Sequence, residues 1–220
     1  MIDKIEIITV NYNTPDLIER IIKSVRDNEG DYQIRIIDGS DKEPFKTDII
    51  KICEKYDNIM LEQQGWNIHH GRGMDLGVST SKYEYCLSLD SDNYIQQPII
   101  KKMYDGLIEN NKMMIGGHCH VNGSGEGIGR NYSKEYPIKY YHPSLLMIKT
   151  EYYLRLKAVG ITFIHHGAPS IKIMKYLYDN NISDIVGISL WDYLNISETE
   201  ISKYTNLKSR GTVNRFGYNL

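Results

Sequence analysis

The chain has 220 residues, of which 41% are hydrophobic and 25% are charged, and its formal net charge is −2. A chain of this length and composition can bury a hydrophobic core, which excludes a disordered tail or a small disulfide-stapled scaffold. The Lys and Arg residues are scattered along the chain rather than gathered in one segment, so we expect no binding to nucleic acid.

The three cysteines, Cys53, Cys86 and Cys119, are odd in number and widely spaced, which is typical of reduced thiols in the cytoplasm. No apolar run approaches the roughly 18 residues that cross a bilayer. The first residues, "MIDKIEII", do not have the pattern of a signal peptide. We therefore expect a cytoplasmic protein without a membrane span.

The first ninety residues alternate between short apolar runs and amphipathic stretches. The apolar runs predict β-strands at residues 4–10, 32–38, 59–64 and 83–90. Helices are predicted from Pro15 to Gly30, with Thr14 as N-cap, and at residues 47–56 and 71–81. Strands that alternate with helices in this way favour an α/β fold, with a mostly parallel central sheet covered by helices on both faces.

The second half of the chain is less regular. Its patterns predict helices at residues 98–111, 150–157 and from 171 onward, and strands at residues 112–121 and 184–190. A segment rich in Gly and Tyr, residues 122–144, is predicted to be a long loop. Since no repeat or linker interrupts the chain, we expect residues 1–220 to form a single domain.

Polar and aromatic residues follow each of the first four predicted strands. In open α/β sheets, ligands bind at the carboxyl ends of the strands. The predicted site therefore draws on residues Asn11, Tyr12, Asn13, Asp38, Gly39, Ser40, Asp41, Gly65, Trp66, Asn67, Asp90, Ser91 and Asp92.

Asp90 and Asp92 end the fourth predicted strand, with no basic residue nearby in sequence. On an extended chain, two such side chains point the same way and lie roughly 6.6 Å apart. Two carboxylates at this spacing can bind a hard divalent cation that fills its shell with water and phosphate oxygens. A solvated turn without a ligand is the alternative interpretation.

Four motifs together resemble a known family. "ITVNYN", "IIDGSD", "NIHHGRGMDLG" and "LSLDSDNYI" are similar, in order and spacing, to the nucleotide-binding half of family 2 glycosyltransferases with the GT-A fold and its DxD motif. The resemblance covers most of residues 4–95. It implies transfer of a sugar from a nucleotide diphosphate sugar, with a UDP-sugar favoured, to a hydroxyl of a glycan, lipid-linked or other acceptor, usually with inversion and with Mn²⁺ or Mg²⁺.

The resemblance also implies roles for individual residues. Residues 1–95 would hold the donor, and residues 96–220, with a flexible C-terminal tail, would shape the acceptor site. Asp92 would bind the metal, and Asp90 would face the ribose or a metal-bound water and also contribute to the metal site. The remaining nucleotide-sugar contacts would come from Val10, Asn11, Tyr12, Asn13, Asp38, Asp75, Ser91, Lys208 and Arg210.

The sequence departs from the family at the expected general base. Family members usually have an acidic pair where this chain has Ala168 and Pro169. His165 and His166 are the nearest titratable groups, and a histidine can accept a proton near neutral pH. Asp184 and Asp192 are the alternative candidates for the general base. A further alternative is a degenerate protein that binds the donor without turnover.

Other classes of function fit less well. A nucleotidyltransferase is expected to have a glycine-rich and basic loop after its first strand, which "VNYNTPD" lacks. "GRGMDLG" has one residue too many for the dinucleotide-binding fingerprint. His118 and His120 in "HCH" provide at most two zinc ligands, so we interpret them as structural or as lining the acceptor site.

Overall fold

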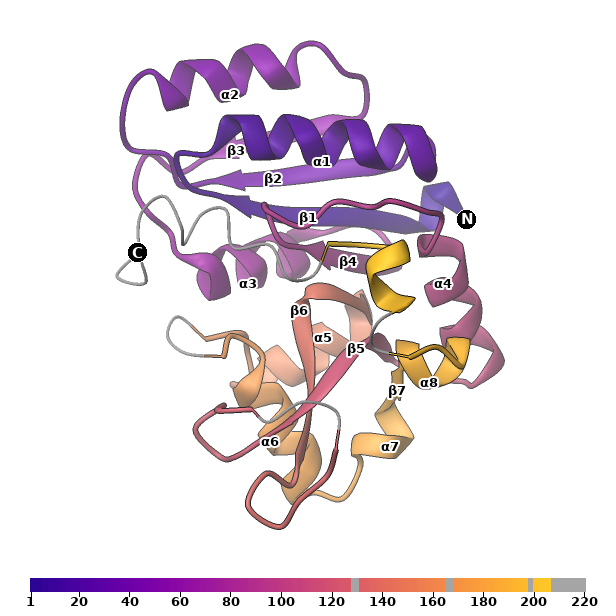
Figure 1. Ribbon diagram of the computed structural model, residues 1–220. Helices are drawn as coiled ribbons and strands as arrows, with labels where there is room; N and C mark the ends of the chain where they lie inside the picture. Colours follow the sequence, from indigo (N-terminus) through magenta and orange to yellow (C-terminus); the bar gives the residue numbers. More distant parts are fainter. Residues whose placement is uncertain (128–130, 165–167, 198–199, 207–220) are drawn as a thin grey trace.

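The computed structural model describes residues 1–127, 131–164, 168–197 and 200–206. Within these residues, one sheet contains the strands β1 (Ile5–Asn11), β2 (Gln33–Asp38), β3 (Ile59–Gln63), β4 (Tyr85–Leu89), β5 (Met114–Val121), β6 (Ile138–Lys149) and β7 (Gly187–Ser189). Their order is β3-β2-β1-β4-β6-β5-β7 (Figure 1). Only β6 runs against its neighbours, β4 and β5. The mostly parallel sheet confirms the predicted fold class.

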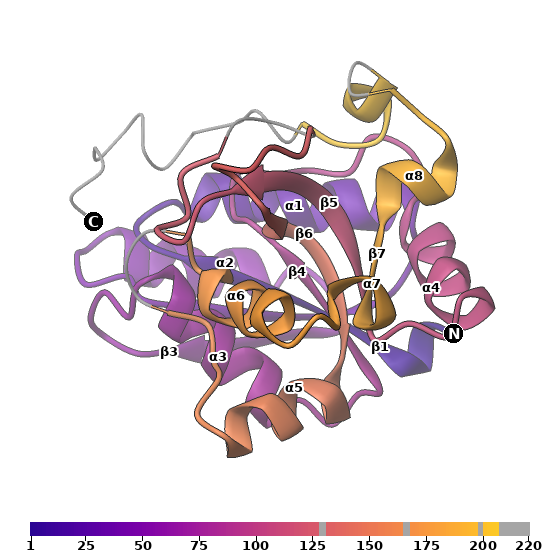
Figure 2. The same ribbon diagram turned by 90° about the horizontal axis from the view of Figure 1, so that it is seen from below.

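Helices cover both faces of this sheet. Those in the described residues are η1 (Ile2–Lys4), α1 (Pro15–Asn28), α2 (Phe45–Cys53), α3 (His70–Thr80), α4 (Ile100–Glu109), α5 (Thr150–Ala158), α6 (Ile171–Asp179), α7 (Ser183–Val186), α8 (Leu190–Leu194) and η2 (Glu200–Lys203). Side chains of α1, α2, α4 and α8 share one hydrophobic cluster, and those of α3, α5 and α6 share the other. Figure 2 shows α3, α5 and α6 in front of the sheet and α1 behind it.

The strands of the first half form where the apolar runs predict them. Every residue of β1 and β4 is buried, as expected for central strands covered by helices on both faces. Pro15 opens α1 directly after Thr14, and the chain leaves this helix through Gly30, whose φ of 99° is a left-handed conformation that glycine adopts at little cost.

Two predictions in the second half were wrong. Residues 138–144 belong to strand β6 and not to a loop, because Tyr140 and Tyr141 are buried core residues. Pro143 lies where the pairing of β6 with β5 shifts register between Gly116 and His118. The predicted strand at residues 184–190 is shorter, because its first part forms helix α7.

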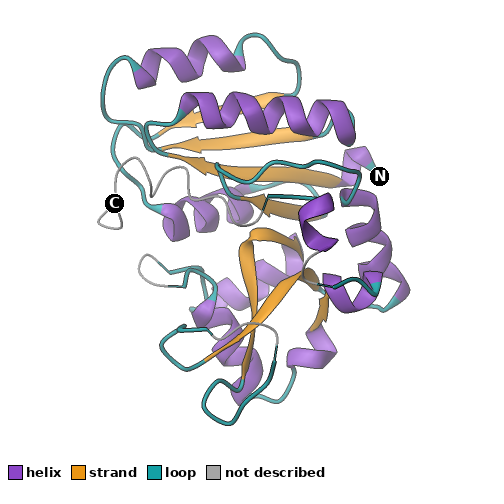
Figure 3. Cartoon of the chain, in the orientation of Figure 1, coloured by secondary structure: helices purple, strands orange, loops and turns teal. Residues whose placement is uncertain are grey.

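The carboxyl ends of the parallel strands gather at one edge of the sheet. In Figure 3 the arrowheads of β1 and β2 point to this edge, and loops connect it to the following helices. Asn11 ends β1 and is in register with Asp38, which ends β2. The described part of the chain contains no helix that is both long and apolar enough to cross a membrane.

Candidate functional site

A buried polar network joins the ends of β1 and β2. The Asp38 carboxylate has no exposed surface, and its Oδ1 accepts hydrogen bonds from Asn11 Nδ2 at 2.9 Å and from Ser40 Oγ at 2.6 Å. Its Oδ2 accepts a bond from Gln63 Nε2 at 3.3 Å. Thr14 Oγ1 in turn donates to Asn11 Oδ1 at 2.8 Å. Both oxygens of this buried carboxylate therefore already have partners within the protein.

The turn after β1 lies over this network. Asn13 has a φ of 53°, a left-handed conformation that asparagine tolerates better than most residues. Its backbone N–H donates to Ser40 Oγ at 3.0 Å, and its Nδ2 donates to Asp41 Oδ1 at 3.0 Å. Tyr12 is partly exposed and donates from its hydroxyl to Asp41 Oδ2 at 3.2 Å. The Oδ1 atom of Asn13 is buried and has no hydrogen-bond partner in the described residues.

Asp90 and Asp92 do not lie on an extended strand, as the spacing argument assumed. Strand β4 ends at Leu89, and the N–H of Asn93 donates to the Asp90 carbonyl at 2.9 Å, which closes a tight turn over residues 90–93. Ser91 is a buried residue of this turn, whereas Asp90 and Asp92 are partly exposed. The two-residue spacing therefore does not fix the distance between the two carboxylates.

Asp90 has a basic partner that is distant in sequence. His70, the first residue of α3, places Nε2 at 2.9 Å from Asp90 Oδ1. Burial alone would lower the pKa of the His70 imidazole, but the carboxylates of Asp90 and Asp92 outweigh it and raise this pKa above its usual value. Burial alone would raise the pKa of the Asp90 carboxyl, but His70 holds it below its usual value. The contact thus favours the charged forms of both groups.

Strand β6 holds the turn from one side. The backbone carbonyl of Ser144 accepts a hydrogen bond from Asn93 Nδ2 at 2.8 Å and another from the Asp90 N–H at 3.4 Å. The Ser144 N–H donates to His142 Nδ1 at 3.1 Å, so the neutral His142 ring carries its proton on Nε2. His142 is exposed beside the turn.

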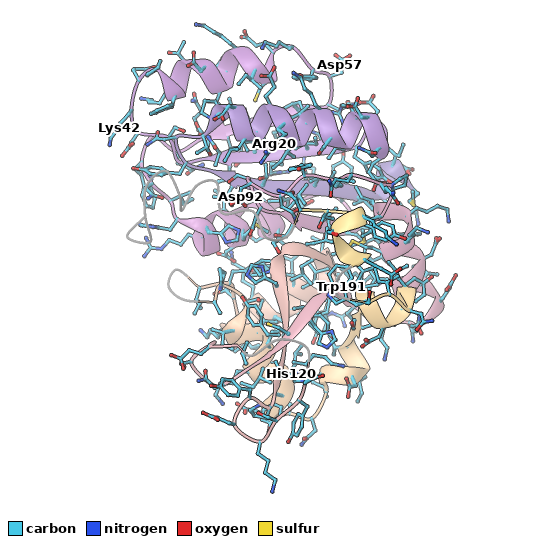
Figure 4. The ribbon with its side chains drawn as sticks, in the orientation of Figure 1. Arg20, Lys42, Asp57, Asp92, His120 and Trp191 are labelled. Carbon is cyan, nitrogen blue, oxygen red and sulfur yellow. The ribbon has the colours of Figure 1, made fainter. Side chains whose placement is uncertain are left out.

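Helix α1 and residues 204–206 hold the turn from the other side. The Arg20 guanidinium lies 4.4 Å from the centre of the Tyr94 ring, and its Nη2 is 3.5 Å from the Asp92 carbonyl oxygen. Figure 4 shows Arg20 on α1 directly beside Asp92. The same carbonyl accepts a bond from Asn206 Nδ2 at 3.0 Å. The backbone of this turn is therefore fixed by groups from three separate parts of the chain.

The remaining predicted residues are less directly connected to this turn. Val10 is buried against Gly73 of α3. Asp75 accepts hydrogen bonds from Tyr153 Oη at 2.7 Å and from Lys157 Nζ at 2.9 Å, so both its oxygens already have partners on α5. Its contact with a nucleoside stays a prediction. The predicted residues His165, His166, Lys208 and Arg210 lie outside the described residues.

The donor set at the turn suits a hard divalent cation. Asp90 and Asp92 provide carboxylate oxygens, and Mg²⁺ and Mn²⁺ are commonly bound by one or two carboxylates together with water and substrate phosphates. The described residues contain no group of three or more His, Cys, Asp and Glu side chains that could hold a metal ion. A cation held by these two carboxylates would take its other ligands from water and substrate.

The two histidines of "HCH" lie elsewhere. His118 and His120 are mostly buried on β5, with ring centres 5.6 Å apart, and His118 Nδ1 is 2.7 Å from Ser189 Oγ. Figure 4 shows His120 well separated from Asp92. These contacts agree with the interpretation of the pair as structural.

Sequence reasoning missed His70, Arg20 and Asn206. The start of α3 was predicted at residue 71, one position after His70, and no spacing rule connects it with the end of β4. Arg20 lies in the helix predicted from Pro15 and was given no role, and Asn206 was placed in the C-terminal tail. Only the wound topology of the sheet, which brings the ends of β1, β2 and β4 together, locates these residues at the site.

A family model described as "Glycosyl transferase family 2" matches residues 6–174. A curated relative, the poly(ribitol-phosphate) beta-N-acetylglucosaminyltransferase TarP of Staphylococcus aureus, is 27% identical over 132 residues. This alignment covers 57% of the present chain and 39% of TarP. The chain therefore spans well under half the length of that relative.

Two groups of solved structures have the same fold. TarS 1–349 of S. aureus, solved in complex with UDP-GlcNAc, has a TM-score of 0.57 and 19% identity, over 79% of the present chain and 53% of that one. The mannosyltransferase PcManGT from Pyrobaculum calidifontis, solved with GDP-Man and Mn²⁺, has a TM-score of 0.56 and 11% identity, over 76% of the present chain and 50% of that one.

Proposed function

The chain belongs to glycosyltransferase family 2, and we propose that it transfers a sugar from a nucleotide diphosphate sugar to an acceptor hydroxyl with the help of a divalent cation. The observation that carries this proposal is the Asp90–Asp92 turn at the carboxyl end of β4, beside the buried polar network at the ends of β1 and β2. Residues 1–95 would hold the donor, and the later residues would shape the acceptor site.

The donor half has polar groups suited to a nucleoside. Asn13 Oδ1 is buried without a hydrogen-bond partner among the residues that the structure describes, and the neighbouring Tyr12 is partly exposed, so a nucleobase could contact both. Asp38 would accept a hydrogen bond from the base or ribose on Oδ2, which can accept a second bond beside the one from Gln63. A UDP-sugar is the favoured donor, and the UDP-GlcNAc complex of the structurally similar TarS supports this choice.

The turn would hold the diphosphate side of the donor. Asp92, together with Asp90, would bind Mn²⁺ or Mg²⁺, which when bound stabilises negative charge on the leaving diphosphate. The solved complex of PcManGT with Mn²⁺ supports a cation in this role. Arg20 and Asn206 keep the backbone of this turn in place through the Asp92 carbonyl.

The C-terminal segment would contribute Lys208 and Arg210. Residues 204–206 are anchored beside the turn, since Gln96 N–H donates to the Tyr204 carbonyl at 2.7 Å and Ile95 pairs with Thr205. We propose that the basic residues that follow this anchor in sequence contact the diphosphate, because an arginine guanidinium can bind two phosphate oxygens at once.

Transfer with inversion needs a base for the acceptor hydroxyl, and we propose His166, with His165 as the alternative. The loop that carries both begins and ends at described residues, where Ile164 N–H donates to the Pro169 carbonyl at 2.8 Å. Ser170 Oγ then donates to the Tyr141 carbonyl at 2.8 Å, on the strand that also holds the Asp90–Asp92 turn. The described residues on either side of both histidines are thus tied to the strand that holds the turn, which supports this proposal.

Thermal stabilisation by UDP-, GDP-, CMP- and dTDP-sugars, with and without Mn²⁺, tests the proposal. A metal-dependent shift for one nucleotide identifies the donor. Released nucleotide, measured in the presence of candidate acceptors, then separates a transferase from a degenerate donor-binding protein, the alternative that Ala168 and Pro169 suggest. Absence of a shift with every donor would contradict the proposal.

A further inference from the structure

The chain enters α3 through a backbone conformation that few residues adopt. His69 has φ of 62° and ψ of 154°, in a region that is populated almost only by glycine. Such conformations persist where the surrounding structure enforces them, and they cluster at functional sites. The strained residue directly precedes His70, the first residue of α3.

The loop before His69 is held tightly. A Cβ atom added to Gly39 would lie 3.0 Å from both the Trp66 carbonyl oxygen and the Ile68 backbone nitrogen, so this loop packs directly on the backbone that follows β2. The N–H of His69 donates to Asn67 Oδ1 at 3.0 Å. The conformation of His69 is thus fixed from the donor half of the sheet.

His70 uses this fixed start of the helix to contact a single oxygen. Its Nε2 is 2.9 Å from Asp90 Oδ1 in an ion-pair contact, and neither atom has a hydrogen-bond partner in the described residues. The side chains are 32% and 23% exposed, but the two contacting atoms are themselves buried.

We propose that His70 is a positioning residue for donor binding: it holds Oδ1 of Asp90, so that only Oδ2 is available to the ribose or to metal-bound water. This inference rests on the proposed function. His70 acts through Asp90. The imidazole fixes one oxygen and so restricts the Asp90 carboxylate to one orientation before the donor binds. The side chain therefore loses less conformational entropy on binding.

The test measures the dissociation constants of UDP, GDP, CMP and dTDP by calorimetry in the presence of Mn²⁺. We compare the wild type with His70→Ala and with His70→Gln, whose amide can donate to the same oxygen. His70→Ala should weaken binding of the preferred nucleotide about 10–100-fold, the usual effect of removing the partner of a group at a metal site. His70→Gln should restore most of the affinity, with both melting temperatures close to that of the wild type.

A double-mutant cycle keeps the test independent of effects on folding. If His70 acts through Asp90, His70→Ala should weaken UDP binding little further once Asp90→Asn is present. The affinity for Mn²⁺ alone, measured from the electron paramagnetic resonance of the free ion, gives a readout without nucleotide. An effect on UDP binding that is additive with that of Asp90→Asn would overturn the proposal.

The outcomes separate this inference from the proposed function. If the wild type binds none of UDP, GDP, CMP and dTDP with Mn²⁺, the proposed function fails and the role of His70 fails with it. If the wild type binds and His70→Ala binds equally well, only the positioning role is wrong. Equal weakening in His70→Ala and His70→Gln would also contradict it.

Discussion

Asn206 donates a hydrogen bond from Nδ2 to the backbone carbonyl of Asp92, and the two atoms lie 3.0 Å apart. The same side chain accepts a bond on Oδ1 from the Tyr94 N–H at 2.6 Å. One amide therefore satisfies two backbone groups of the segment that contains the candidate metal ligand. This contact connects the chain before Lys208 to the donor site.

Replacement of Asn206 by Ala should destabilise this part of the protein. Two partly buried backbone groups lose their partner, which costs about 1–3 kcal/mol of the free energy of unfolding. Urea denaturation checks this value. Asn180→Ala is the control, because the exposed Asn180 also donates from Nδ2 to one carbonyl, that of Tyr176, and its loss should cost within about 0.5 kcal/mol. Equal effects of the two variants would contradict the structural role of Asn206.

Much of the nucleotide-binding half could be predicted because its strands are short, apolar and bounded by turn residues. Strand β1, for example, was predicted one residue from its observed ends. Strand β6 could not be predicted in full, because His142 and Pro143 interrupt its apolar pattern, although Tyr140 and Tyr141 are buried by α6 and neighbouring strands. Tertiary packing there overrides the local pattern.

Replacement of the strained His69 by Gly should stabilise the fold. The strain of a non-glycine residue in this conformation costs about 1–3 kcal/mol, and glycine relieves it. Glycine also has more conformational freedom in the unfolded chain, which offsets about 0.5–1 kcal/mol of this stabilisation. We expect a net gain of roughly 1 kcal/mol in the free energy of unfolding. Asn111→Gly serves as the control, because Asn111 has a φ of 50° that asparagine tolerates. A loss of stability in His69→Gly would show that the imidazole itself is required.

The buried ion pair between β1 and β2 should be important for stability. Arg35 Nε lies 3.0 Å from Glu6 Oε1, and the side chain of Glu6 is fully buried. Glu6→Gln would leave the Arg35 charge without its buried partner and should cost about 3–5 kcal/mol of the free energy of unfolding. Glu62→Gln removes a partner that is 30% exposed and should cost about 1 kcal/mol or less. Chemical denaturation of the two variants compares these costs directly.

The thiols of the buried Cys86 and the partly buried Cys53 should react slowly in the native protein. Burial raises the pKa of Cys53 to about 12 and that of Cys86 to about 11. Because a raised pKa keeps a thiol protonated, both should alkylate far more slowly than free cysteine at pH 8, and faster as the pH rises or the protein unfolds. Mass spectrometry after timed iodoacetamide treatment measures these rates. Fast native labelling of Cys86 at pH 8 would contradict its burial.

The sequence predicts only those site residues that lie at the ends of recognisable strands. Asn11, Asp38 and Asp90 were placed correctly at the sheet edge, because each directly follows or ends a recognisable strand. The contact of His70 with Asp90 depends on where α3 begins, and the turn at residues 90–93 depends on Ser144 from β6. Such contacts between distant segments leave no periodic pattern in a single sequence.

The central claim is a metal-dependent donor site at Asp92, and calorimetric titration of UDP in the presence of Mn²⁺ tests it most directly. The wild type and Asp57→Ala, an exposed residue that Figure 4 shows away from the site, should bind UDP only with the metal. Asp92→Ala should lose this binding while its melting temperature stays nearly unchanged. Metal-dependent UDP binding by Asp92→Ala at wild-type affinity would contradict the account.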